Sequence, residues 1–477
     1  MRLKLFAMII GLPLLGLVFG CSVHSPQQAT LPTPVPSAYV ERSAAPDPAS
    51  LVERWWERFG EPELDELMTE AFAANPDLRQ AFARLEQAEA VVRTTGAAQR
   101  PSFDLNAAGG RRRQTAGSLG AVTEDTYSLS LPASFEIDLW RKLASRTEAA
   151  RLDAAASREE VKALYLSLSA QVADLYFLAL EQRAQLALTD SNIAAFADTL
   201  ERVERRYREG LVPALDVYQS RQNLASARSR RPQFENGLAA AEHALSVVLG
   251  QYPGRGVAEG DLPAAIPEFP AGVPSLLLSR RPDIEADLLR LKASDARIAA
   301  AIADRFPALR LTGSYGGQSE VLGDLLGSGN ILWNLLLNIA QPLYDGGRRA
   351  AEVDRTRAVF RENLAGYHQS VLTAFREVED ALAAGRTGEE RIARLAEREE
   401  ASASALRLSL DRYLQGLSDY LPVLTAQGLH FNAQSELLAA RRQLIADRIT
   451  LARSLGGAWM EAELTNNNHR ASFDQGP

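Results

Sequence analysis

The most regular pattern in the chain is a strict alternation of apolar and polar residues over residues 126–139. A period of two is that of a β-strand with one apolar and one polar face. A tilted strand of about 9–11 residues is long enough to span a bilayer. The pattern therefore predicts a membrane strand with lipid on one side and water on the other. The apolar set is Tyr127, Leu129, Leu131, Ala133, Phe135, Ile137 and Leu139.

A shorter alternating run lies upstream, with the apolar residues at odd positions of 103–107. Together the two runs predict a β-hairpin over residues 102–139. Its connection is expected to be a long polar loop over residues 109–125, which contains the run Arg111-Arg112-Arg113. If that loop is external, the arginines either meet lipopolysaccharide phosphates or are simply solvated.

Helical spacing dominates the remaining sequence. Residues 141–209 contain neither proline nor glycine, and apolar residues recur at steps of three and four. This pattern predicts one helix of roughly 100 Å at 1.5 Å per residue, which needs packing partners along its length. Residues 210–213 predict a turn, residues 214–249 a return helix, and residues 251–274, rich in proline and glycine, a linker.

The arrangement then occurs a second time. Pro76-Asp77 is echoed by Pro282-Asp283 (282 − 76 = 206), and Pro101 before the first hairpin by Pro307 (307 − 101 = 206). A nearly fixed offset over half the chain predicts an internal repeat of helix, two strands, long helix, turn and helix. The expected segments are a first repeat over 51–250, a linker over 251–274, a second repeat over 275–460 with its hairpin at 308–344, and a flexible C-terminal tail over 461–477.

Four membrane strands in one chain imply an oligomer. An unpaired strand edge in lipid costs several kcal/mol for each polar group, and single-chain barrels begin at about eight strands. A dimer would supply eight strands and a trimer twelve. Because an eight-stranded barrel largely fills with side chains, a conduit favours the trimer.

The N-terminus predicts targeting to a membrane. Basic residues and an apolar run precede Val18-Phe19-Gly20-Cys21, which resembles a bacterial lipobox, and Ser22 favours the outer membrane. Cys21 is the only cysteine and can form no internal disulfide. We expect residues 1–20 to be a lipoprotein signal peptide, Cys21 to carry covalent diacylglycerol and an N-acyl chain, and residues 21–50 to be a flexible tether. The alternative is an ordinary signal peptide with an incidental cysteine. No other apolar run has the length expected of a membrane helix.

Charge and composition exclude several classes of function. The net charge is −8, and no basic block with interleaved aromatic residues suggests a nucleic acid partner. The five histidines are scattered without metal-ligand spacing. No nucleophile elbow or phosphate loop is present. We therefore expect no enzyme activity, no metal and no cofactor besides the lipid on Cys21.

Six motifs together carry a family resemblance: W-W-E-R-F-G-E-P-E-L-D-E-L, N-P-D, S-R-R-P-D-I-E-A, F-P-A-L-R-L-T-G-S, P-L-Y-D-G-G-R-R and R-Y-L-Q-G-L-S-D-Y-L. From about residue 55 to about residue 460 the chain resembles the outer-membrane efflux channels, and more closely their NodT-type lipoprotein branch. The resemblance implies a mixed fold, in which a homotrimer forms a twelve-stranded transmembrane β-barrel continued by a long periplasmic α-helical barrel. It also implies docking on a periplasmic adaptor (membrane fusion) protein and an inner-membrane pump of the resistance–nodulation–division (RND) type. Small molecules would then pass through passively.

The resemblance places function at the ends of the two helical hairpins, over residues 206–217 and 412–423. Three copies of Asp419 near one axis would repel one another and favour the passage of cations. Thr425 stands where relatives often carry an aspartate, so the aperture would be less acidic. The residues expected to face the adaptor are Gly210, Asp216 and Gly416, and those expected to line the periplasmic aperture are Tyr413, Asp419 and Leu421.

Three alternatives stay open at this stage. The tips could be ordinary helix turns with solvated charges. The channel could be a conduit for type I protein secretion instead of small molecules. A periplasmic coiled-coil scaffold lipoprotein without a pore would suit the long helices and Cys21, although it would not explain the four alternating segments.

Overall fold

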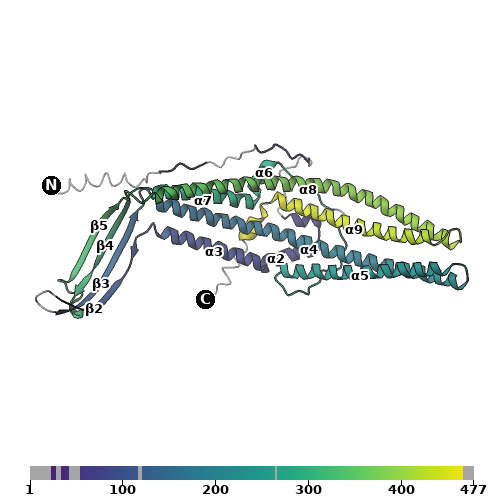
Figure 1. Ribbon diagram of the computed structural model, residues 1–477, viewed down its shortest axis with the longest axis horizontal. Helices are drawn as coiled ribbons and strands as arrows, with labels where there is room; N and C mark the ends of the chain where they lie inside the picture. The colour runs from purple at the N-terminus through teal and green to yellow at the C-terminus, as the bar shows by residue number, and fades with distance from the viewer. Residues whose placement is uncertain (1–22, 28–33, 42–53, 116–120, 264–265, 466–477) are drawn as a thin grey trace. The chain divides into compact units, whose positions relative to one another are not determined.

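The computed structural model describes residues 23–27, 34–41, 54–115, 121–263 and 266–465. The expected signal peptide and Cys21 lie outside the described residues. These residues form two compact units, whose helices and strands are labelled in Figure 1. Unit 1 contains residues 23–27, 83–115, 121–158 and 285–369, and unit 2 contains residues 34–41, 54–82, 159–263, 266–284 and 370–465.

Unit 1 contains an antiparallel sheet made from two hairpins. Its strands in chain order are β1 (Ser102–Phe103), β2 (Asn106–Thr115), β3 (Ala121–Ile137), β4 (Ala308–Ser319) and β5 (Ile331–Ala340), with the short helix η5 (Leu322–Asp324) between the last two. β3 pairs on one edge with β1 and β2, which form one interrupted strand, and on the other edge with β4. β4 in turn pairs with β5. Both predicted hairpins are present, and the β3–β4 pairing joins them into one sheet.

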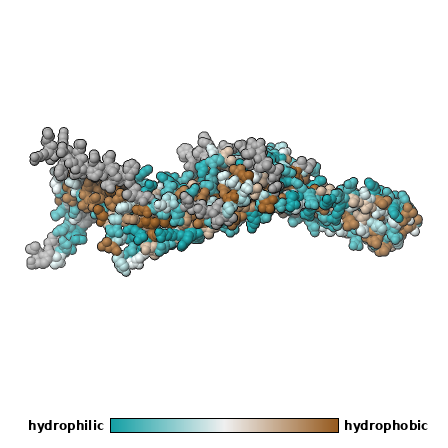
Figure 2. Space-filling view, turned by 90° about the horizontal axis from the view of Figure 1, so that it is seen from above, coloured by the Kyte–Doolittle hydropathy of each residue, from teal (hydrophilic) through white to brown (hydrophobic). Residues whose placement is uncertain are grey.

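The register collects the apolar residues of these strands on one face. Residues directly opposite each other in an antiparallel pair point to the same side of the sheet. Leu131 lies opposite Tyr315, and Tyr315 lies opposite Trp333. This face is open to solvent: the residue Trp333 is 74% exposed, and Figure 2 shows hydrophobic residues on the surface of the sheet. The other face carries polar residues such as Ser128 and Ser130, as the alternation predicts.

The strands of the first hairpin are longer than predicted, and the expected loop over 109–125 is wrong. β2 and β3 continue to pair from Gly109–Tyr127 to Thr115–Ala121. Arg111 lies opposite Asp125, with 3.3 Å between its Nε and Oδ1 of the carboxylate. Opposite charges across a strand pair stabilise polar strand ends. A prediction based only on alternating apolar residues does not detect such polar pairs. The three arginines are therefore strand residues.

The helices of the two halves have matching lengths. The pairs are α3 (Pro76–Ala97) and α7 (Pro282–Ala303) with 22 residues each, α4 (Lys142–Arg208) and α8 (Arg348–Leu414) with 67 each, and α5 (Ala214–Val248) and α9 (Leu421–Leu455) with 35 each. The predicted uninterrupted long helix is α4. Asn75 caps α3, because its Oδ1 accepts hydrogen bonds from the backbone N–H of Asp77 (2.9 Å) and Leu78 (3.1 Å).

Aromatic residues form the core of unit 2. η3 (Trp55–Phe59) and α2 (Pro62–Ala74) contribute Trp56 and Phe72, whose rings lie 4.9 Å and 5.7 Å from that of Trp459. Phe59 packs against Phe177 of α4 at 4.8 Å. Such aromatic pairs contribute about 0.5–1.5 kcal/mol each beyond the area they bury. The short N-terminal helices are thereby fixed to the long helix.

The expectation that no other apolar run could cross a membrane is wrong for α4. Among the described residues, α4 contains a window long and apolar enough by length and composition. However, 61% of that window is buried inside the protein, as in the core helix of a soluble protein. The aromatic core explains this composition, because the part of α4 in unit 2 must present apolar residues to several neighbours.

Parts of the expected tether and linker are packed. Tyr39 is buried, and the Glu379 carboxylate accepts hydrogen bonds from the backbone N–H of Val40 (2.8 Å) and Glu41 (3.0 Å). In the linker, the buried Val257 accepts a hydrogen bond of 2.6 Å from Arg183 through its carbonyl oxygen. The linker ends where α6 (Pro274–Arg280) begins. Proline-rich composition does not reveal such contacts, because the partners are distant in sequence.

The tail expected to be flexible from residue 461 also differs. Residues 461–465, the described part of this tail, are helical. Leu464 is fully buried, and Glu463 accepts a 2.5 Å hydrogen bond from Arg54. These contacts hold the described tail against unit 2.

Two glycines with the same backbone conformation allow a test of close packing. Gly456 and Gly272 both have φ of +71°. A Cβ on Gly456 would lie 2.5 Å from the carbonyl oxygen of Arg280, whereas a Cβ on Gly272 would meet nothing within 4 Å. Gly272→Ala should lower the free energy of unfolding by about 1 kcal/mol through strain alone. Gly456→Ala adds a backbone clash and should lower it by about 3 kcal/mol. Urea unfolding followed by tryptophan fluorescence measures both, and equal losses would contradict the packing described.

Candidate functional site

Each helical hairpin of unit 2 reverses direction at a glycine. Gly210 and Gly416 have φ of +74° and +75°. The following residues close the helix ends, because Leu211 N–H bonds Arg206 O and Leu417 N–H bonds Arg412 O, both at 2.9 Å. A Cβ at either glycine would meet nothing within 4 Å, so the left-handed backbone alone explains the residue type.

The two tips pack against each other through a small apolar cluster. Its members come from all four long helices and from the second turn. They are Val203, Val217, Tyr413, Tyr420 and Val423, with Leu200, Val212, Leu410, Leu414 and Leu424 around them. Burial of these side chains holds the α4–α5 tip against the α8–α9 tip.

Polar contacts cross the same junction, and we call Arg206, Asp216 and Tyr413 the tip latch. The Tyr413 hydroxyl donates a hydrogen bond of 3.2 Å to Oδ2 of Asp216. Arg206 donates a 2.6 Å hydrogen bond to the carbonyl oxygen of Leu414. Its guanidinium also lies 5.3 Å from the centre of the Tyr413 ring. The Tyr420 ring packs on Tyr413 at 5.2 Å.

Burial makes the latch carboxyl a proton-sensitive group. Asp216 is 8% exposed and Tyr413 only 2%. Burial raises the pKa of Asp216, and the negative charge of Asp419 raises it further. The Tyr413 hydroxyl and the Arg206 charge act in the opposite direction, but the pKa of Asp216 stays above its ordinary value. Burial and the Asp216 carboxylate likewise raise the pKa of Tyr413.

Further polar contacts continue the junction away from the tips. Gln427 of α9 donates a hydrogen bond of 3.0 Å to the hydroxyl of Thr199 on α4. Farther along α9, Ser435 and Gln185 exchange two hydrogen bonds, of 2.8 and 2.9 Å. On the α5 side, Arg230 donates a 2.9 Å hydrogen bond to Asn432. α9 is therefore joined to both helices of the first hairpin.

The structure separates the expected tip residues into two groups. Gly210, Gly416 and Asp419 are exposed, and Leu421 is 59% exposed. Tyr413 and Asp216 differ from expectation, because each is buried and is the other's hydrogen-bond partner. Tyr413 therefore does not line an opening in this structure, and Asp216 does not present a surface for docking.

Arg206 and Tyr420 complete the junction, and sequence reasoning missed both. Both tips carry an Arg-Tyr pair, Arg206-Tyr207 and Arg412-Tyr413. Tyr207 is 47% exposed, in contrast to its buried counterpart Tyr413. The paired motifs were the available signal, but they do not say which tyrosine turns inward.

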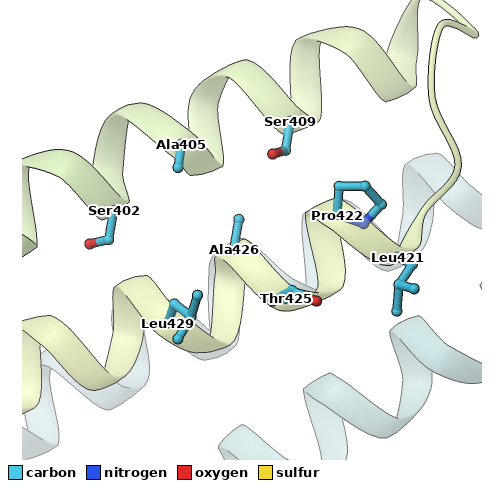
Figure 3. A pocket seen from close by; sticks show the side chains of 8 residues that line it. All are labelled: Ser402, Ala405, Ser409, Leu421, Pro422, Thr425, Ala426 and Leu429. Atoms are coloured by element: carbon cyan, nitrogen blue, oxygen red, sulfur yellow. The ribbon is translucent and has the colours of Figure 1, made fainter.

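A groove of about 420 Å³ lies between α8 and α9 near the second tip (Figure 3). Figure 3 shows Ser402, Ala405 and Ser409 pointing from α8 toward α9. These side chains are too short to fill the space between the helices. The lining is completed by Leu421, Pro422, Thr425, Ala426 and Leu429. At its inner end, Ser402 Oγ lies 3.1 Å from Nδ1 of His430.

A model of the outer membrane efflux protein family matches the chain twice, over residues 67–251 and 273–457. The chain is 30% identical over 467 residues to the probable efflux pump outer membrane protein TtgC of Pseudomonas putida, covering 95% of this chain and 96% of TtgC. It is 29% identical over 464 residues to the probable outer membrane lipoprotein SilC of Salmonella typhimurium, covering 95% and 99%. The solved outer-membrane channel OprN superimposes with a TM-score of 0.87 at 28% identity, covering 92% of this chain and all of that one.

Removal of the Tyr413 hydroxyl tests the tip latch. Tyr413→Phe keeps the packed ring but leaves the buried Asp216 without its donor, a loss of about 1.5–3 kcal/mol for a hydrogen bond to a charged group. Opening of the tip should become at least roughly tenfold more frequent, and trypsin should cleave after the neighbouring Arg412 faster by that factor. Tyr207→Phe is the matched control and should leave the cleavage rate unchanged. Equal rates for the two variants would show that the bond does not hold the tip.

Proposed function

This chain belongs to the outer membrane efflux protein family, and we propose that three copies of it form one channel across the outer membrane. The chain is the outer-membrane component of an efflux system. The exposed apolar face of the sheet carries the proposal. An apolar face of this extent matches a lipid environment, and the polar face behind it matches a water-filled interior.

The sheet edges give the copy number. β1 and β2 form one outer edge of the sheet and β5 forms the other. Edges exposed to lipid would leave backbone groups without hydrogen bonds, so we expect the edge of one copy to pair with the opposite edge of the next. Three copies would close a twelve-stranded barrel with an open lumen, whereas eight strands would largely fill with side chains. The exposed apolar sheet also disfavours the scaffold without a pore.

In this proposal the long helices α4, α5, α8 and α9 of three copies form the periplasmic conduit. A periplasmic adaptor docks on the exposed tips, where Leu211, Leu215 and Leu417 lie at the surface beside Gly210 and Gly416. Figure 2 shows hydrophobic residues at this end of the hairpins. An inner-membrane RND pump supplies the energy, and exported small molecules pass through the duct passively. The similarity to TtgC favours small-molecule efflux over protein secretion.

The tip latch gives this duct a closing device. Asp419 and Leu421 project from the second tip, so three copies would place three carboxylates and three leucines around one mouth. Opening requires α8 and α9 to move away from α5, and the bond between Tyr413 and Asp216 opposes that movement. The apolar cluster around Tyr413 restrains the same movement.

The lipid anchor belongs to the same proposal. SilC is named a lipoprotein, which supports acylation of Cys21 by diacylglycerol and an N-acyl chain. Just after Cys21, Nε2 of His24 lies 2.8 Å from Oδ1 of Asp295 on α7. This contact would hold the start of the mature chain against unit 1.

Planar-bilayer conductance tests the channel and its mouth. Wild-type protein should give a small current that prefers cations, because three carboxylates surround the mouth. Asp419→Ala combined with Leu421→Ala should raise the current several-fold and weaken the cation preference. The exposed Leu429→Ala, away from the turn, is the control. Absence of current from well-inserted protein would refute the pore, and equal large currents would place its constriction elsewhere.

The raised pKa of Asp216 predicts that acid closes the duct. A carboxyl with a higher pKa in the latched state than in the open, solvated state binds its proton more tightly when latched. Protonation therefore favours the latched state, and this stabilisation is lost as the pH rises through the raised pKa. Conductance should fall as the pH is lowered toward the ordinary carboxyl range, near about pH 4.

Two variants isolate Asp216 from the other groups at the junction, namely Arg206, Tyr413 and Asp419. Asp216→Asn mimics the protonated side chain and should abolish most of the pH dependence while keeping a low conductance. Asp419→Asn removes the charge at the mouth and should retain the dependence. A conductance that rises on acidification of the wild type would contradict the assignment.

A further inference from the structure

Two arginines of β2 lie on the apolar face of the sheet. Arg111 is opposite Asp125 and Arg113 is opposite Thr123. By the register these positions share a face with Tyr127 and Leu129, which are opposite Gly109 and Ala107. Two long cationic side chains therefore follow an apolar band on the side of the sheet that faces lipid in the proposed channel.

Their height along the strands matches a membrane boundary. The apolar band of β3 runs from Ile137 to Tyr127, which is 137 − 127 = 10 steps along the strand. Ten steps of about 3.3 Å give roughly 33 Å along the strand, and a tilt of about 40° reduces this to roughly 25 Å, the height of the apolar band of membrane barrels. α4 begins just after Ile137, so the helical end is periplasmic in the proposed channel. Arg111 and Arg113 lie past the other end, at the outer leaflet.

We infer that Arg111 and Arg113 bind the phosphate groups of lipopolysaccharide, the phosphorylated glycolipid of the outer leaflet. The inference rests on the proposed orientation of the barrel in the outer membrane. A guanidinium presents a planar set of donors that matches phosphate oxygens, and it carries its charge at any physiological pH. Tyr127 lies at the end of the apolar band, between the band and the two arginines, which is the position typical of an interfacial aromatic residue.

One carboxylate shares this face and is part of the site. Arg111 pairs with Asp125, but the side chains of the two residues are 75% and 41% exposed. An ion pair so open to water contributes little, so Arg111 remains able to bind a phosphate. Arg113 faces a threonine rather than an acid. Both arginines are exposed on β2, the strand labelled in Figure 1.

The middle arginine supplies a matched control. Arg112 lies between the two in sequence but points to the opposite face, where its strand neighbour is Glu124. Replacement of Arg112 changes the net charge as replacement of either neighbour does. Only the neighbours project toward lipid, so the inference predicts different effects from identical substitutions.

Binding of purified lipopolysaccharide to the full-length protein in detergent tests the site. Wild-type protein should bind lipopolysaccharide roughly tenfold more tightly than the same material after removal of its lipid A phosphates. Arg111→Gln and Arg113→Gln should each lose part of that factor and their combination about all of it, whereas the single Arg112→Gln should retain wild-type affinity. Arg111→Lys combined with Arg113→Lys should lose less than the glutamine pair, because the charge remains.

Three results would overturn the inference. The first is equal affinity of the wild-type protein for lipopolysaccharide with and without its lipid A phosphates. This result overturns the inference even if the glutamine variant fails to fold. Equal losses from Arg112→Gln would indicate a diffuse charge effect, and displacement of lipopolysaccharide by millimolar inorganic phosphate would indicate a general anion site. Conductance of the same preparations tests the channel separately, so an active channel without phosphate-dependent binding would refute only this site.

Discussion

The need to pair every backbone N–H and C=O group in a place without water shapes this protein more than any other constraint. The sheet of unit 1 satisfies that need inside the chain from β2 to β5 but leaves its two outer edges open. In water such edges are a liability for aggregation, and in lipid they are not tolerated. The apolar face and the open edges are therefore both explained by the proposed trimer, in which other copies complete the sheet.

In unit 2, the tips of the hairpins depend on a balance that is easily shifted. Apolar packing around Tyr413 and Val423 brings the two hairpins together, and a buried carboxylate at Asp216 partly opposes that packing. Its hydrogen bond to Tyr413 offsets some of the cost of burial without removing it. A junction built in this way is stable enough to form and weak enough to open, which suits the mouth of a duct.

The internal repeat gives two similar hairpins with different tasks. Gly210 and Gly416 make the same reversal with the same backbone hydrogen bonds. The neighbouring tyrosines have diverged in environment, because Tyr207 faces solvent and Tyr413 is buried. The two tips therefore share a backbone geometry but differ in their side-chain contacts, because one carries the acid of the latch and the other carries the hydroxyl.

Elements whose cause is local were predictable from the sequence. Alternation in 126–139 gave a strand with an apolar face, the absence of proline and glycine gave α4, and a fixed offset gave two halves with equal helices. Asn75 was predictable as a cap, because its role depends only on the next three residues. The family resemblance also predicted that function lies at both tips.

Contacts between distant segments were decided only by the tertiary structure. The pairing of β3 with β4 and the burial of Tyr39 and Leu464 depend on partners far away in the chain. The continuation of β2 through its arginines depends on the residues of β3 that come to lie opposite them. The same holds for Tyr413, which the sequence placed at an opening and the fold turned toward Asp216. Residue patterns report which face of an element is apolar, but the free energy of a buried polar group depends on which partner meets it, and that is set when the elements pack.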